Sequence, residues 1–516
     1  MACVGVFVAY LPVTTVSVSL PAIQRALNAS TSELSWVSSA FVLPVAALIL
    51  TSGVFGDVHG RKKVFQAGLA FCALGATVSL SAQSVQSVWA GQALSGVGSA
   101  ALQPMTLALI SHAVPDPRER GKFIGLWATS LMAALAVGPL IAGLIVDHFA
   151  WRWIFLPTVP VALLVMALSV PLLRDSRAPG SRRLDWPGQI TAALAVTALV
   201  YGVIEGGAGS FADARVMVAL SVAAVALVAF VLVEKRSESP MLDLSLFRSP
   251  AFTATTVVIM ITFLGLIGFF FVLSLYFGTV QHLSTLEAGL RLLMVTLVPV
   301  ALGGVFGRLS RKVSARVLIT GGLLVTAAAL LSLTTIDAVT SFGSLAWRLA
   351  LLGLGLGTTF TAVTATAVAS VPHHLAGMAA AGNNAFRQVG GALGPAVLGT
   401  LLTTKAVDAL PGHLAGVDGT AGARIISAVE TGGFGAVARM DLGPMRGKTL
   451  GALSEAFVDG LHLCLIVSAA LMLLAAVISA LLLRRTRQTS VTVAVGTASN
   501  ATPTAAAAAA QERISQ

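Results

Sequence analysis

Charged side chains that could do chemistry in a hydrophobic environment are rare in this sequence. Only 10% of the 516 residues are charged, whereas 56% are apolar. Arg387 is the clearest case, because it lies within an apolar stretch. Spacings of four, three and four place it on one helical stripe with Asn383, Gly390 and Gly394. Its guanidinium could bind an anionic or polar substrate, or it could donate to carbonyls exposed by a kink at Gly390, Gly394 and Pro395. Both interpretations stay open here.

A second candidate is a glycine-rich turn with one acid, formed by Gly53, Gly56, Asp57, Gly60, Arg61 and Lys62. The first two glycines let a neighbouring helix approach closely, and Gly60 permits a tight turn. The basic residues anchor such a turn at the cytoplasmic face of a membrane. Asp57 is the only acid there, and a generic basic turn with one stray acid has the same composition.

Polar residues inside other apolar stretches are candidates for a substrate cavity. The candidates are Thr14, Ser17, Gln92, Gln103, Asn383 and Arg387. A mostly apolar cavity with a few hydrogen-bonding groups suits an amphipathic small molecule.

Small residues and prolines form a third group, which we interpret as a hinge or packing surface. Its members are Ala134, Gly138, Pro139, Gly143, Gly390, Gly394 and Pro395. Ala134 and Gly138 are four residues apart and share one face of a helix, which allows close packing. Pro139 removes a backbone hydrogen bond and bends the helix. Ordinary small-residue packing remains the alternative.

Several chemistries are absent from the sequence. No Cys/His cluster has metal spacing, and no Gly-Lys-Ser/Thr loop is present to bind ATP. Gly353, Gly355 and Gly357 follow no strand and are not a nucleotide loop. The three cysteines lie in apolar runs, so we expect reduced thiols and no disulfide. No basic leader or cleavage site indicates a signal peptide. We therefore expect no cofactor, no metal and no enzyme.

The elements that must position these residues are membrane-spanning helices. A helix needs roughly 20 apolar residues to cross a bilayer, and lipid leaves backbone groups without other partners. The sequence predicts about fourteen spans, near 3–23, 38–56, 64–82, 89–112, 122–146, 153–173, 187–204, 214–233, 252–277, 286–307, 316–335, 343–370, 377–403 and 457–483.

Lys and Arg concentrate in alternate turns, which predicts that both termini are cytoplasmic. The net charge of +11 is then explained by topology and anionic lipid, and not by nucleic-acid binding.

The chain also repeats itself. Gly53-Val-Phe-Gly56 recurs as Gly304-Val-Phe-Gly307, and the Gly-Pro pair at Gly138 recurs at Gly394. Repeats at one long period indicate two similar halves around a central site. We predict an N-terminal six-helix bundle at 1–175 and an inserted pair of helices at 176–249. A C-terminal six-helix bundle follows at 250–485 with an outer loop at 404–456, which is long enough to contain a short surface helix. Residues 486–516 are a disordered cytoplasmic tail.

The motifs resemble those of a known family. The turn around Asp57 is similar to the loop signature between the second and third spans of the major facilitator superfamily. In that family its acid ties two helix ends together and holds the inner gate closed. The stretch Ala134 to Gly143 resembles the signature of its exporters. The words Leu184-Asp-Trp-Pro-Gly188 and Arg387-Gln-x-Gly-Gly391 resemble the fourteen-span drug:proton antiporters. The resemblance implies an all-α major facilitator fold, with two pseudo-symmetric six-helix bundles plus two extra helices.

Two departures from this family concern proton coupling. The family has an acid in the first span where this sequence has Pro12, and an arginine in the fourth span where it has Gln92. Losing both leaves no orphan charge in the membrane. The sequence also carries no Asp or Glu deep within the other spans. Whether protons are a coupling partner is therefore left open.

The resemblance implies a secondary active transporter that exports amphipathic drugs or hydrophobic natural products by alternating access. A transport-incompetent membrane sensor or scaffold is the alternative, and uptake is the alternative to export. Arg outnumbers Lys and Ala is abundant, which suggests a GC-rich bacterial source and a location in the cell membrane.

Overall fold

The computed structural model describes residues 1–114, 117–173, 175–177, 184–372, 375–414, 419–432, 434–437, 440 and 446–483. The described part of the chain is all-α. The first six long helices are α1 (Ala2–Leu27), α2 (Thr31–His59), α3 (Arg61–Leu80), α4 (Val85–Ala113), α5 (Pro117–His148) and α6 (Thr158–Leu172). A short 3-10 helix, η1 (Trp151–Phe155), precedes α6.

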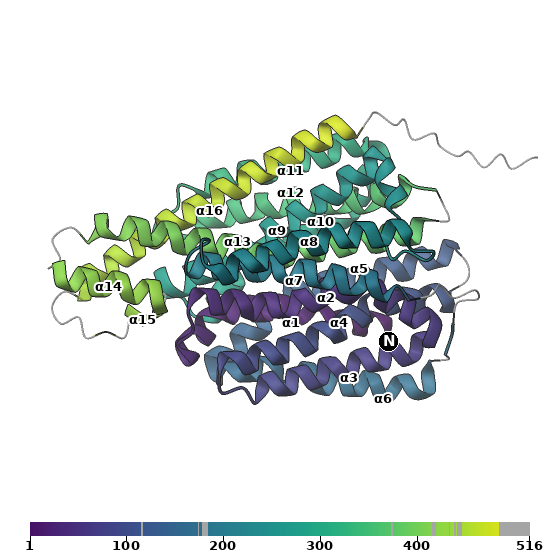
Figure 1. The fold of residues 1–516 in the computed structure, drawn as a ribbon, viewed down its shortest axis with the longest axis horizontal. Coiled ribbons are helices and arrows are strands. Elements are labelled where there is room, and N and C mark those ends of the chain that lie inside the picture. The colour runs from purple at the N-terminus through teal and green to yellow at the C-terminus, as the bar shows by residue number, and fades with distance from the viewer. Residues whose placement is uncertain are drawn as a thin grey trace, which may run out of the picture. The chain divides into compact units, whose positions relative to one another are not determined.

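Two further helices, α7 (Trp186–Ala208) and α8 (Ala214–Arg236), precede the short η2 (Leu244–Arg248). The remaining elements are α9 (Pro250–Leu275), η3 (Tyr276–Val280), α10 (Thr285–Lys312), α11 (Ala315–Leu333), α12 (Phe342–Ala369), α13 (Ala376–His413), α14 (Gly419–Gly432), α15 (Phe434–Val437) and α16 (Arg446–Leu482). Figure 1 shows how these helices are arranged.

Each of the fourteen predicted spans coincides with one long helix. Among the described residues, thirteen helices are long and apolar enough to cross a membrane. The fourteenth, α13, is richer in small and polar residues, yet it packs against α2, α9 and α16. The protein is therefore an integral membrane protein.

The two halves are built by the same local rules. Ser30 and Glu33 form a capping box at the start of α2, and Ser284 and Glu287 form one at the start of α10. In a capping box, the serine hydroxyl and the glutamate carboxylate satisfy backbone N–H groups that the first helical turn leaves unpaired. The same signature thus begins the second helix of each half.

Close helix packing repeats in the same way. A Cβ added to Gly96 in α4 would lie 2.3 Å from the carbonyl oxygen of Phe41 in α2. A Cβ added to Gly353 in α12 would lie 2.3 Å from the carbonyl oxygen of Val295 in α10. Glycine therefore lets the second and fourth helices of each half touch backbone to backbone. This correspondence supports the pseudo-symmetric six-helix bundles of the major facilitator fold.

The additional helices α7 and α8 pack against each other, and α7 also contacts α2 and α13, one helix from each bundle (Figure 1). The α7 helix begins at the word Leu184-Asp-Trp-Pro-Gly188, where the Asp185 carboxylate accepts from the Gly188 N–H at 2.8 Å. Gln189 then donates to the carbonyl of Ala47 in α2 at 2.9 Å.

The segment 404–456 differs from the predicted outer loop. The α13 helix continues to His413, α16 begins at Arg446, and α14 and α15 lie between them. Ile425 and Val429 of α14 are buried in the same apolar cluster as Leu410 of α13, so the described part of the segment is a packed helical extension. The predicted tail 486–516 lies outside the described residues.

Candidate functional site

A cavity of about 100 Å³ lies between helices of both bundles. Four helices of each half line it: α1, α2, α4 and α5 from the first half, and α9, α10, α12 and α13 from the second. Most of the lining is apolar, with Leu, Ile, Val, Met and Phe side chains. The polar or charged side chains that line it are Tyr10, Thr14, Ser17, Gln103, Thr262, Thr296, Arg387 and Gln388.

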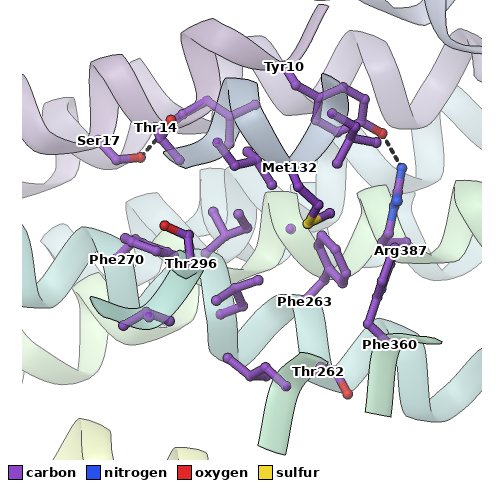
Figure 2. Close-up of a pocket in the computed structure, with 18 of the residues that line it drawn as sticks. Tyr10, Thr14, Ser17, Met132, Thr262, Phe263, Phe270, Thr296, Phe360 and Arg387 are labelled. Atoms are coloured by element: carbon purple, nitrogen blue, oxygen red, sulfur yellow. Dashed lines mark hydrogen bonds between the residues drawn. The ribbon is translucent and has the colours of Figure 1, made fainter. Parts of the chain in front are cut away.

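Some of the polar groups form one hydrogen-bonded cluster. The Arg387 guanidinium donates to the Tyr10 hydroxyl (Figure 2), and the Tyr10 hydroxyl donates to Gln103 Oε1 at 2.8 Å. The amides of Gln388 and Asn384 also donate to Gln103 Oε1, at 3.2 and 3.4 Å. The cluster joins α1 and α4 of one bundle to α13 of the other.

Aromatic rings surround the arginine. The Arg387 Cζ atom lies 5.1 Å from the ring centre of Phe263, 5.6 Å from that of Tyr10 and 5.8 Å from that of Phe360. These distances allow cation–π attraction. Arg387 is 8% exposed, and within the described chain no carboxylate lies within ion-pair distance of it. Its partners are side chains and not the backbone carbonyls that one sequence interpretation proposed.

The other predicted cavity residues divide into two groups. Thr14 and Ser17 line the central cavity with Gln103 and Arg387. Gln92 is buried at an adjacent space of about 10 Å³, which Pro12 also lines. The two positions that depart from the family pattern are thus neighbours, which explains why both charges could be lost together. Asn383 is buried but does not line the central cavity, and it is the next residue, Asn384, that reaches Gln103.

The sequence reasoning did not single out Tyr10, Asn384 or Gln388 as site residues. Their hydroxyl and amide groups within predicted spans could have identified them, because a polar side chain in an apolar environment needs a hydrogen-bond partner. The rings of Phe263 and Phe360 carried no signal, since phenylalanine is common on any apolar helix.

The turn around Asp57 has a defined geometry. The Arg61 guanidinium binds the Asp57 carboxylate through Nε at 2.9 Å and Nη2 at 2.8 Å, so the end of α2 is tied to the start of α3. Gly60 lies between them with φ +113°, which favours glycine. A Cβ on Gly56 would lie 2.2 Å from Met105 Sδ in α4, whereas one on Gly53 would have no atom closer than 3.9 Å.

Residues in the last turn of α6 and just after it complete this turn. Asp175 accepts from the Lys62 N–H at 3.2 Å, and Lys62 Nζ donates to the Val170 carbonyl at 2.7 Å. A carboxylate beside the first N–H groups of α3 is favourable because a helix N-terminus carries a partial positive charge. In the other half, Arg308 occupies the position of Asp57, so this ion pair has no counterpart there.

The hinge and packing residues serve two kinds of contact. Gly138, Gly390 and Gly394 pack within a bundle: Cβ atoms there would lie 2.2 Å from Thr14 Oγ1, 2.0 Å from the Met260 carbonyl oxygen and 2.6 Å from the Gly268 nitrogen, respectively. Ala134 is fully buried.

Gly143, Pro139 and Pro395 face the opposite bundle. A Cβ on Gly143 would lie 2.3 Å from the Leu286 Cα in α10, and one on Gly289 would lie 2.6 Å from the Pro139 carbonyl oxygen. On the other side of the cavity, the Ser35 hydroxyl of α2 donates to the Pro395 carbonyl of α13 at 3.2 Å.

These cross-bundle contacts lie at one end of the helices. We call the opposite end, which carries the α2–α3 turn at Gly60 and the α10–α11 turn at Val313, the basic end. There, Cβ atoms on Gly303, Gly304 and Gly377 would meet nothing within 4 Å. The backbone contacts between the bundles described above therefore lie away from the basic end.

Comparisons with known proteins agree with this architecture. A family profile described as Major Facilitator Superfamily matches residues 2–395. The chain is 32% identical over 484 residues to the Tetracenomycin C resistance and export protein of Streptomyces glaucescens, covering 92% of this chain and 89% of that protein. It is 34% identical over 390 residues to the Puromycin resistance protein pur8 of Streptomyces alboniger, covering 74% and 76%. It is 31% identical over 390 residues to the Multidrug resistance protein Stp of Mycobacterium tuberculosis (strain H37Rv), covering 76% and 72%.

Solved structures show the same fold. A bacterial homologue of the human lysosomal transporter Spinster, in an inward-facing and unoccupied conformation, superposes with a TM-score of 0.65 at 15% identity, covering 93% of this chain and 95% of that one. The xylose transporter XylE from E. coli, in an inward-open conformation, gives a TM-score of 0.57 at 11% identity, covering 95% and 96%. At these identities the likeness concerns the fold alone.

Proposed function

Because the chain belongs to the major facilitator superfamily, and is thus a transporter and not an enzyme, we propose that it exports amphipathic drugs or hydrophobic natural products by alternating access. The observation that carries the proposal is the central cavity, which four helices of each bundle enclose. Its apolar lining and its polar cluster around Arg387 suit a substrate with an apolar body and a polar group. The resistance and export proteins among its relatives support the same substrate class.

We place the protein in the plasma membrane with both termini in the cytoplasm, so that the basic end faces inward. In this orientation we infer that the contacts of Gly143 and Pro395 seal the cavity towards the outside. The turn of Gly53, Gly56, Asp57, Gly60, Arg61 and Lys62 acts as the inner gate. Pro139, Gly394 and Pro395 act where the bundles rock.

The domains follow the same proposal: bundles at 1–175 and 250–485 with the helix pair 176–249 between them. Membrane lipid covers the apolar outer faces, including α8, where Val218, Val225 and Leu227 are all more than half exposed. Transport uses neither ATP nor nucleic acid. Arg387 is the only charged side chain among the described residues that line the cavity, and the efflux experiment below decides whether protons are exchanged.

Efflux from cells that lack their own pumps tests the function. Cells that produce the protein should retain less of some dyes or antibiotics in a small panel than cells with an empty plasmid. The panel is repeated with an agent that collapses the proton gradient, which shows whether protons are required. Equal retention of every compound, together with no flux in reconstituted vesicles, would instead leave a sensor or scaffold with a transporter fold.

A further inference from the structure

The central cavity contains a positive charge that no acid balances. Arg387 keeps its charge in a protein, and the nearest groups that receive its hydrogen bonds are the neutral Tyr10 and Gln103. Its Nε atom is buried and has no hydrogen-bond partner among the described residues. A buried charge without an opposite charge is costly, so a ligand that supplies the missing negative charge relieves that cost, less the free energy of removing its own charge from water.

The surroundings of Arg387 also define the rest of the ligand. Phe263 and Phe360 stand beside the guanidinium with their ring centres 5.8 Å apart. Beyond them the cavity is apolar, and Thr14 contributes a hydroxyl that has no partner within the described chain. An aromatic body with one acidic group fits this arrangement, because its ring packs on phenylalanine while its anion faces the guanidinium.

We propose that the exported substrate is an aromatic monoanion, such as an organic sulfonate or carboxylate, and that its negative charge crosses the membrane with it. The inference rests on the proposed export function and narrows its substrate class. Arg387 returns empty in every cycle, so the net charge moved equals the charge of the substrate. Because a cell interior is electrically negative, a monoanion moves outward down its electrical gradient. A voltage of 100 mV alone supports a concentration of the anion outside about fiftyfold higher than that inside. No carboxylate in the cavity is then needed for coupling.

A matched pair of probes tests the charge requirement. 8-Anilinonaphthalene-1-sulfonate and N-phenyl-1-naphthylamine share one aromatic skeleton, and only the first carries a sulfonate. The purified protein in nanodiscs should bind the sulfonate at least about tenfold more tightly than the neutral amine, because charge-assisted hydrogen bonds are the stronger ones. This comparison needs no mutation and so does not depend on the folding of a variant.

Variants then assign the effect to one side chain. Arg387→Gln should weaken sulfonate binding about tenfold or more and leave the neutral amine nearly unchanged, whereas Arg387→Lys should retain part of the preference. Arg291→Gln is the control. Arg291 also donates to a glutamine, Gln281, at 2.6 Å and lies over Phe277 at 5.7 Å, but it does not line the cavity.

Flux in proteoliposomes tests the voltage dependence. A potassium gradient with valinomycin sets the voltage, with the pH equal on both sides. The sulfonate should accumulate in vesicles with a positive interior and not in those with a negative interior, whichever way the protein is inserted. Protein-free vesicles give the background.

Three results would overturn the inference while the transport function stands. The first is flux of the amine, or of the cation ethidium, without flux of the sulfonate. The second is sulfonate flux that follows a pH gradient and does not depend on voltage. The third is an equal loss of sulfonate binding in Arg291→Gln and Arg387→Gln. If none of the three probes moves under any gradient and no compound of the efflux panel is exported, the export function itself fails.

Discussion

A backbone-to-backbone contact between the two bundles makes Gly143→Val in α5 an informative substitution. A Cβ at this position would lie 2.3 Å from the Cα of Leu286 and 2.8 Å from its nitrogen, and ordinary contact begins at 3.4 Å. Backbone atoms cannot rotate aside as a flexible side chain can. To accept the new side chain, α5 and α10 must separate by about 1.1 Å, the difference between 3.4 and 2.3 Å.

This separation acts on one conformation only. Inserting atoms into a packed interface costs about 1 to 3 kcal/mol, and 1.4 kcal/mol changes an equilibrium tenfold. The conformation in which the ends of α5 and α10 away from the basic end touch should therefore lose population by about 5- to 150-fold. In the opposite conformation these ends are apart and the side chain has room. We expect the variant to fold, insert and remain open at this end, with export strongly reduced.

Distances between spin labels test the expectation. Labels at the exposed positions His148 and Leu290, in a background without the three native cysteines, should move apart in Gly143→Val. Gly304→Val is the control, because it adds the same side chain to α10 where nothing lies within 4 Å. Unchanged label distances and normal export in Gly143→Val would show that this contact does not seal the cavity.

Three further predictions concern the turn at the basic end and the helical extension. Asp57→Asn breaks the ion pair that ties α2 to α3. Because an exposed pair stabilises a protein by about 1 kcal/mol or less, thermal stability should barely change while export is lost. Normal export in this variant would remove the gate assignment. Gly60→Ala should lower the free energy of unfolding by about 1 to 2 kcal/mol, because Gly60 has a φ of +113° and lies beside the Asp175 carboxylate. Gly321→Ala in α11 is the control and should not lower it, because nothing lies within 4 Å of the added Cβ. Chemical denaturation measures both variants. Hydrogen bonding to Asp459 at 2.8 Å raises the pKa of His413. Protonated His413 should therefore stabilise the fold by less than about 1 kcal/mol at low pH, and this contribution is lost as pH rises through the raised pKa. The resulting fall in melting temperature across a pH series should vanish in His413→Gln.

The helices and the repeat could be predicted because both depend on local composition. Apolar length locates a span without knowledge of its neighbours, and the recurrence of the Gly-Pro pair marks equivalent helices. The repeated word Gly-Val-Phe-Gly shows the limit of this reasoning. Phe55 is 37% exposed and stacks on His59, whereas Phe306 is 6% exposed and lies against Gly357. The two copies of this sequence motif lie in different environments because the surrounding helices differ.

The candidate site could be predicted only in part for a related reason. Arg387 and Gln103 were recognisable, since a polar group in lipid must serve some purpose. Their connection through Tyr10 joins residues separated by 93 and 377 positions in the chain, and no periodicity within one helix predicts such a contact. For the helical extension beyond residue 404 the sequence predicts an outer loop, because the glycines and charges there resemble those of a surface segment.

The polar cluster has a consequence for alternating access. Tyr10 and Gln103 belong to the N-terminal bundle, and Arg387, Gln388 and Asn384 belong to the C-terminal bundle, so rocking the bundles apart strains these bonds. A buried donor that loses its acceptor costs about 1 to 3 kcal/mol, and the empty protein would bear this cost in every cycle. A substrate that accepts from Arg387 replaces the lost acceptor and lowers the barrier. The residues that join the bundles across the empty cavity are thus the ones that a substrate must engage, which links binding to the conformational change without a titrating acid.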